Sequence, residues 1–253
     1  MQTEMSVVEK KISARDRLIF ALDVETADEA RAIVSRLKPH AGMFKIGSQL
    51  FTAAGPGIVR EIVEEGGRVF LDLKFHDIPN TVARAGVEAA RLGVSIFNVH
   101  ASGGSEMMRR TAREVHEAAA RENFAPPSII AVTALTSANA ATLAEAGVSS
   151  GVEEQVARLA RLASDCGMDG VVASPHEVQL VRATVERKSF LVVTPGVRPA
   201  GASHGDQKRV MTPGDAVRAG ADYLVVGRAI LDAADISHAA EEIIREMQMA
   251  EEE

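Results

Sequence analysis

The chain has 253 residues, of which 46% are hydrophobic, and this is enough apolar material for a substantial core. Its 28 Lys and Arg residues against 35 Asp and Glu residues give a formal net charge of -7, which excludes the basic surface typical of nucleic-acid-binding proteins. A small anionic ligand needs only a local basic pocket, which this charge does not exclude. The single cysteine, Cys166, excludes an intrachain disulfide, and we expect an inert packed thiol in a reducing compartment.

Residues 1–17 carry mixed charge and lack the apolar segment of a signal peptide, so we expect them to be an N-terminal lead-in. No apolar run in the sequence reaches the roughly 18 residues of a membrane-spanning helix. We therefore expect a cytoplasmic protein that has no nucleic-acid or membrane partner.

Eight short apolar runs follow along the chain, and each is predicted to be a β-strand. They are Leu18–Val24, Met43–Gly47, Arg68–Phe75, Val94–Ala101, Ser128–Leu135, Gly170–Ser174, Phe190–Val197 and Tyr223–Ile230. Several are almost continuously apolar, as expected for strands that are buried on both faces of a parallel sheet. The segments between these runs have Ala, Leu, Val, Arg and Glu at helical spacing and are predicted to be helices. Examples are Asp28–Lys38, Asn80–Leu92, Gly104–Glu122 and Glu153–Asp165.

Strand and helix alternate throughout the chain, without a linker that would separate two domains. Eight such units in a chain of this length predict an α/β protein with a single (β/α)8 barrel, the TIM-barrel fold, over residues 18–253. The alternative is a doubly wound open sheet, which usually has a Gly-x-Gly-x-x-Gly turn after its first strand. The corresponding segment, Leu22–Thr26, contains no glycine and favours the barrel.

Charged residues gather at the ends of the first three predicted strands. Side chains alternate between the two faces of a strand, so Asp72 and Lys74 share the inward face, and Asp23 and Lys45 lie inward on their own strands. Asp77 follows just beyond the third strand. Burial of several charges seldom stabilises a protein, and barrel active sites lie at this end of the strands, so we interpret the cluster as functional. Lys74, among carboxylates, should stay protonated and act as an acid.

Arg198, Gly227 and Arg228 lie at the ends of the last two predicted strands. Barrels commonly bind phosphate there, through backbone N–H groups, and an arginine can add two parallel hydrogen bonds to the phosphate. The turn-rich stretch 200–209, which contains Gln207, is typical of a lid loop over a ligand.

Two histidines lie near the charged cluster. His76 lies just after the end of the third predicted strand and is expected to have a supporting role, whereas His100 ends the fourth strand and is expected to orient a neighbour through a hydrogen bond. No spacing of His, Cys or carboxylate residues typical of a tight metal site occurs in the sequence, so no metal is predicted.

These motifs together resemble the orotidine 5′-phosphate decarboxylase family in its bacterial form. The matching blocks are Ala21–Val24, Phe44–Gly47, Leu71–Val82, Asn98–Gly104, Ala131–Ser137, Asp169–Glu177, Val193–Pro199, Gly205–Pro213 and Tyr223–Ile230. The most specific block is the Asp-x-Lys-x-x-Asp-Ile-x-x-Thr array that begins at Asp72.

The resemblance implies a cofactor-free enzyme that converts orotidine 5′-phosphate to uridine 5′-phosphate and CO2 in pyrimidine biosynthesis. The catalytic residues it implies are Lys74, Asp72, Asp77 and Lys45. In this family Lys74 would protonate C6 of the pyrimidine and Asp72 would lie beside the departing carboxylate. Lys45 and Asp23 would contact the ribose.

The resemblance also implies the rest of the substrate site. Thr136 would meet the pyrimidine edge, and the phosphate would be bound by Gln207, Gly227, Arg228 and Arg198. Asp77 and Thr81 would extend into the site of a neighbouring subunit, which implies a homodimer.

Two alternative functions stay open on the sequence alone. A sugar-phosphate decarboxylase or lyase of the same superfamily would use the array at Asp72 with a magnesium ion on its carboxylates. A non-catalytic barrel would bind nucleotide phosphates without turnover. Metal dependence distinguishes the first alternative, and binding of uridine 5′-phosphate without turnover of its carboxylated precursor distinguishes the second.

Overall fold

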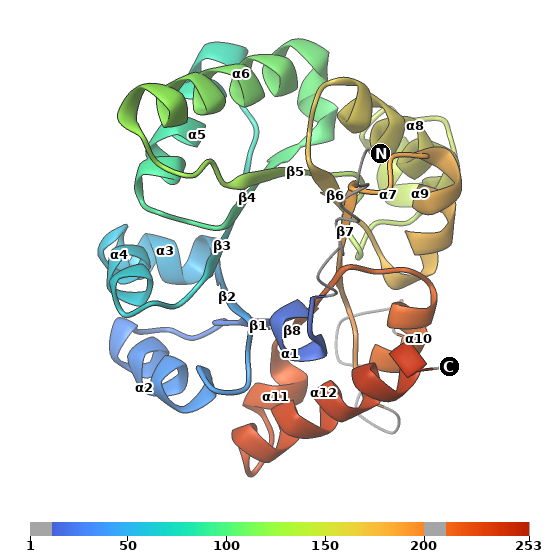
Figure 1. Cartoon of the computed structure of the whole chain (residues 1–253). Coiled ribbons are helices and arrows are strands. Elements are labelled where there is room, and N and C mark those ends of the chain that lie inside the picture. Colours follow the sequence, from blue (N-terminus) through green and yellow to red (C-terminus); the bar gives the residue numbers. More distant parts are fainter. Residues whose placement is uncertain (1–11, 200–210, 253) are drawn as a thin grey trace, which may run out of the picture.

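A computed structural model describes residues 12–199 and 211–252 and shows a closed ring of strands (Figure 1). The eight parallel strands pair in chain order, and the eighth pairs with the first. They are β1 Leu18–Ala21, β2 Met43–Gly47, β3 Val69–Phe75, β4 Ile96–His100, β5 Ser128–Val132, β6 Gly170–Val172, β7 Leu191–Pro195 and β8 Tyr223–Val226. The predicted (β/α)8 barrel is confirmed.

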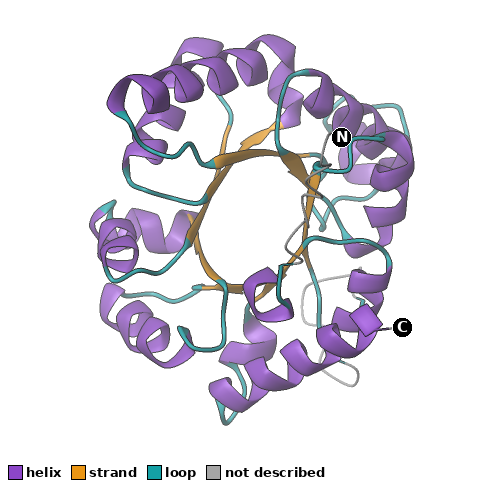
Figure 2. Cartoon of the chain, in the orientation of Figure 1, coloured by secondary structure: helices purple, strands orange, loops and turns teal. Residues whose placement is uncertain are grey.

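Helices surround the ring of strands (Figure 2). They are α1 Ala14–Arg17, α2 Ala27–Leu37, α3 Ser48–Ala54, α4 Gly57–Glu64, α5 Pro79–Arg91, α6 Gly104–Glu122, α7 Ala140–Glu145, α8 Val152–Asp165, α9 Val178–Thr184, α10 Pro213–Arg218, α11 Arg228–Leu231 and α12 Ile236–Glu252, with 3-10 turns at Ala101–Gly103 and Pro175–Glu177. The four predicted helices correspond to α2, α5, α6 and α8 within one residue at each end. Across the described ranges, no helix combines the length and apolar character needed to cross a bilayer.

Several strands end earlier than the sequence predicts. The apolar run of β1 continues to residue 24 and that of β5 to residue 135, but regular strand pairing stops at Ala21 and Val132. The predicted eighth strand is wrong at its end, because Arg228 starts the short helix α11. The residues beyond each strand end form the loops around the barrel mouth, where a barrel carries its functional groups.

Two apolar regions hold the barrel together. The larger one lies between strands and helices and includes the fully buried rings of Phe20, Phe44, Phe97 and Phe190. The second fills the barrel interior with side chains from all eight strands. These are Ile19, Ala21, Met43, Phe70, Ile96, Ile130, Val172, Leu191, Val193, Tyr223 and Val225. Because these side chains fill the interior, a polar site is confined to the C-terminal ends of the strands.

The two ends of the described chain meet beside β8. The Arg17 guanidinium pairs with the Glu251 carboxylate of α12 and donates to the backbone carbonyls of Ala221 and Asp222, just before β8. Its side chain is only 14% exposed, so the ion pair is partly shielded from water. This contact joins α1, α12 and the start of β8.

Close packing between β6 and β7 generates a prediction for stability. A Cβ at Gly170 would lie 2.3 Å from the carbonyl oxygen of Leu191, so Gly170→Ala forces backbone movement inside the barrel. We expect the free energy of unfolding, measured by urea denaturation, to fall by about 1–3 kcal/mol. Gly57→Ala is the control: it meets no atom within 4 Å and should leave stability equal or slightly higher. Equal stability of the two variants would contradict the expected clash.

Candidate active site

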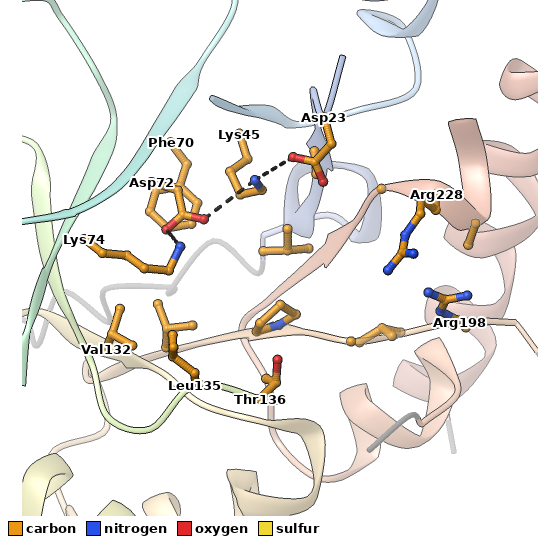
Figure 3. Close-up of a pocket in the computed structure, with 18 of the residues that line it drawn as sticks. Asp23, Lys45, Phe70, Asp72, Lys74, Val132, Leu135, Thr136, Arg198 and Arg228 are labelled. Carbon is orange, nitrogen blue, oxygen red and sulfur yellow. Dashed lines mark hydrogen bonds and ion pairs between the residues drawn. The ribbon is translucent and has the colours of Figure 1, made fainter. Parts of the chain in front are cut away.

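A pocket of about 240 Å³ opens at the C-terminal ends of the strands (Figure 3). Most of the predicted site residues line it: Asp23, Lys45, Asp72, Lys74, Thr136, Arg198, Gly227 and Arg228. They come from six separate strand ends and their loops, so the barrel brings together residues that lie far apart in the sequence.

Four of these side chains form a charged network (Asp23, Lys45, Asp72, Lys74) in which the signs alternate. The Lys74 Nζ lies 2.7 Å from Asp72 Oδ1, and the Lys45 Nζ lies 3.6 Å from Asp72 Oδ2 and 3.1 Å from Asp23 Oδ1. Asp72 and Lys45 are nearly buried, whereas Lys74 is 35% exposed. The network therefore ends in an ammonium group that is accessible from the pocket (Figure 3).

Asp72 is ionised at neutral pH. Burial is the largest single influence and raises its pKa, but the Lys45 and Lys74 ammonium groups, with hydrogen bonds from Lys74 and Asn98, together lower the pKa below its usual value. The stabilisation from these interactions is present above the pKa of the unfolded chain and is lost as the pH falls through the lower folded pKa. A negative charge therefore stays beside Lys74 at neutral and alkaline pH.

The backbone at Lys74 departs from a regular strand. Leu71 pairs with Phe97 and Phe75 pairs with Val99, so three residues of β3 face a single residue of β4. Within this bulge Lys74 has φ +52°, a left-handed conformation that costs a residue other than glycine on the order of 1–3 kcal/mol. Strand alternation correctly predicts that Lys74 points into the barrel, but the local geometry that achieves this is a bulge.

Asn98, the β4 residue opposite the bulge, is a site residue that the sequence analysis does not single out. It is fully buried, its Nδ2 donates to Asp72 Oδ1 at 2.6 Å, and its Oδ1 accepts the backbone N–H of Lys74 at 2.8 Å. The signal in the sequence is an amide between the apolar residues Phe97 and Val99, on the same face as Ile96. Buried amides need partners, so such a residue indicates a polar neighbour.

Arginine side chains lie on the side of the pocket away from Lys74 (Figure 3). Arg198 is 8% exposed and Arg228 begins α11. Between β8 and this helix, a Cβ at Gly227 would lie 3.2 Å from the Cβ of Ala21 and 3.3 Å from Asp23 Oδ2. Glycine at this position lets the start of α11 approach β1 and the charged network closely.

Asp77 and Thr81 lie outside this pocket. Both are exposed, and Asp77 Oδ1 accepts the backbone N–H of Ile78 at 2.6 Å, while Thr81 lies in the first turn of α5. The structure therefore brings neither residue to the Lys74 of its own chain. Gln207 and the stretch 200–209 lie within residues 200–210, outside the described residues.

The two histidines contact each other beside the network. The ring centroids of His76 and His100 are 5.4 Å apart, and His76 is exposed. Burial, followed by the proximity of His76 and Lys74, lowers the pKa of His100, so His100 is neutral at pH 7. The expected orienting hydrogen bond of His100 is not found among the described residues. In the same ranges no three His, Cys, Asp or Glu residues group as metal ligands.

The chain matches the family model "Orotidine 5'-phosphate decarboxylase / HUMPS family" over residues 16–243. It is 55% identical over 242 residues to the orotidine 5′-phosphate decarboxylase of Syntrophotalea carbinolica, with 96% of this chain and 99% of the relative covered. It is 53% identical over 240 residues to that of Moorella thermoacetica, with 94% and 95% covered.

A crystal structure of orotidine 5′-phosphate decarboxylase from Lactobacillus acidophilus has the same fold, with a TM-score of 0.79 and 37% sequence identity. The match covers 91% of this chain and 98% of that one. A solved structure of a conserved protein from Geobacillus kaustophilus, also 37% identical, matches with a TM-score of 0.77. From the extent of these matches, together with the array that begins at Asp72, we conclude that the chain belongs to the orotidine 5′-phosphate decarboxylase / HUMPS family.

Proposed function

We propose that this protein is an orotidine 5′-phosphate decarboxylase, which forms uridine 5′-phosphate and CO2 in pyrimidine biosynthesis. The observation that carries the proposal is the charged network, which ends in the Lys74 ammonium inside a pocket that Arg198 and Arg228 also line. A nucleoside monophosphate suits this arrangement of positive charges, because the arginines attract its phosphate while its ring extends toward Lys74. Thr136 and Gly227 line the same pocket, and we assign Gln207 to the phosphate end.

The chemistry follows from the charge that the reaction creates. When the bond between C6 and the carboxylate breaks, the electron pair stays on C6 in the plane of the ring, where the π system cannot delocalise it. A fixed positive charge in a poorly solvated site stabilises such a carbanion. Lys74 supplies that charge among the apolar side chains of Phe70, Val132 and Leu135, and then donates its proton to C6. Solvent returns a proton to the Lys74 amine after product release.

Asp72 has two roles in this proposal. Its carboxylate forms an ion pair with the Lys74 ammonium at 2.7 Å and so holds the proton donor in place. It also lies next to the position assigned to the substrate carboxylate, so the two negative charges repel each other until CO2 departs. Lys45 and Asp23, at the other end of the network, bind the ribose hydroxyl groups.

A magnesium-dependent sugar-phosphate enzyme fits the network less well. Asp72 Oδ1 already accepts from Lys74 and Asn98, and Asp72 Oδ2 faces Lys45 at 3.6 Å. A divalent cation on Asp72 would lie against two ammonium groups, which repel it. This arrangement favours proton donation by Lys74 over metal binding by Asp72.

The first test measures turnover without metal. Purified protein in excess chelator should deplete the absorbance of orotidine 5′-phosphate and release one uridine 5′-phosphate per CO2. No depletion at high enzyme concentration would refute the decarboxylase proposal. Turnover of an open-chain sugar phosphate that the chelator abolishes would favour the sugar-phosphate alternative instead.

The second test separates chemistry from binding. Lys74→Ala should lower kcat by about 10³-fold or more, because it removes both the proton donor and the fixed charge. The Kd of uridine 5′-phosphate, measured by calorimetry, should change much less. Lys188→Ala, which removes an exposed lysine outside the pocket, is the matched control and should leave both quantities unchanged. Equal losses in kcat and in product binding would remove Lys74 from the chemical step.

We also propose that the protein is a homodimer in which Asp77 and Thr81 of one protomer reach the site of the other. Both residues are exposed and lie outside the pocket of their own chain, and the neighbouring Ile78 is 66% exposed, unusually high for a large apolar side chain. A shared site accounts for all three features.

We also assign residues 18–253 to one catalytic domain after the lead-in 1–17. It assigns the protein to the cytoplasm, a location suited to a single buried cysteine that forms no intrachain disulfide.

Mixing two inactive variants tests the shared site. Lys74→Ala and Asp77→Ala homodimers should each have low activity. After subunit exchange, half of the dimers are mixed and one site in each is intact, so activity should recover to roughly a quarter of the wild-type value. If Asp77 acts in its own chain, every site carries a substitution and mixing restores nothing.

A further inference from the structure

Asn98 lies opposite a segment of β3, residues 72–74, that has no regular backbone pairing with β4. On either side of this segment the pairing is regular: Leu71 pairs with Phe97, and Phe75 pairs with Val99. Between these pairs, Asp72, Leu73 and Lys74 face Asn98 alone, so the Lys74 N–H has no backbone carbonyl of β4 to bond. The Asn98 side chain accepts that N–H instead.

The same amide group binds the catalytic carboxylate. A carboxylate can only accept and a backbone N–H can only donate, so the Asn98 amide must direct its NH2 group to Asp72 and its oxygen to Lys74. One side chain thereby fixes the Asp72 carboxylate and the left-handed backbone of Lys74 relative to each other. The backbone of Asn98 is itself held by the regular pairing of β4 with β5, where Asn98 lies opposite Ile130.

We propose that Asn98 is a positioning residue, which holds Asp72 and the Lys74 backbone so that the Lys74 ammonium points into the pocket. This proposal rests on the proposed function only for the identity of the reaction. An aliphatic residue would leave a buried N–H without a partner, and serine is too short to reach both groups.

The first experiment replaces Asn98 with alanine. Asn98→Ala should lower kcat for orotidine 5′-phosphate by about 10- to 100-fold, as expected for loss of a hydrogen bond to a charged group, with a smaller change in KM. Asn123→Ala, at an exposed position after α6, is the control for loss of an asparagine side chain and should leave kcat unchanged. Wild-type kcat in folded Asn98→Ala protein would overturn the proposal.

The second experiment replaces the amide with an isosteric carboxylate. The charged or titratable groups around Asp72 are Lys45 from β2, Lys74 from β3 and His100 from β4, with Asp23 behind Lys45. In Asn98→Asp a second carboxylate enters this set at hydrogen-bond distance from Asp72. One carboxyl of the pair should hold a proton, so the acid limb of the kcat profile should move up by at least about one pH unit.

A measurement that needs no turnover separates this inference from the proposed function. Carbon-13 NMR of labelled aspartate, with the Asp72 signal assigned from Asp72→Asn, follows the carboxyl directly. The Asp72 pKa should rise in Asn98→Asp, and Asn123→Asp should leave it unchanged. An unchanged Asp72 titration, or activity losses that follow only the unfolded fraction, would overturn the role of Asn98. Absence of turnover in the wild-type protein would overturn the decarboxylase proposal alone.

Discussion

The site depends on one electrostatic constraint, the compensation of a nearly buried carboxylate by two ammonium groups. An isolated ion in the position of Asp72 would be strongly destabilising, yet with Lys45 and Lys74 within 3.6 Å it stays ionised. Both lysines are in turn fixed by the same carboxylate. A protein gains little stability from such an arrangement, so its value lies in holding an ammonium group at one point of the pocket before any ligand arrives.

The barrel supplies the rigidity that this constraint needs. Its interior is filled by apolar side chains from all eight strands up to the level of Ala21 and Phe70. The charged network starts at that level, because Lys45 is the register partner of both residues. Closure of the ring leaves no free strand edge, so each strand end is held from both sides. Loops at the mouth can then carry Thr136, Arg198 and Arg228 toward the same pocket from distant parts of the chain.

The sequence predicts those features that depend on local patterns. Apolar runs locate all eight strands, and alternation directs Asp72 and Lys74 inward. Prediction from the sequence fails where the structure depends on a neighbouring strand. The bulge at Lys74 arises from the register between β3 and β4, and the role of Asn98 arises from that bulge, so neither is visible in a single strand. The end of β8 is mispredicted because Ala229 and Ile230 are apolar and continue the strand pattern, although the chain turns into α11 at Arg228.

The pairs on either side of the bulge make the position of Lys74 a property of two strands rather than of a motif. Leu71 with Phe97 and Phe75 with Val99 fix both ends of the bulged segment, and Asn98 fills its centre. A designer who moved only the Asp-x-Lys sequence into another barrel would obtain a regular strand, whose lysine lacks this backbone conformation. The smallest transferable unit is therefore the β3–β4 pair, with its unequal residue count and its asparagine.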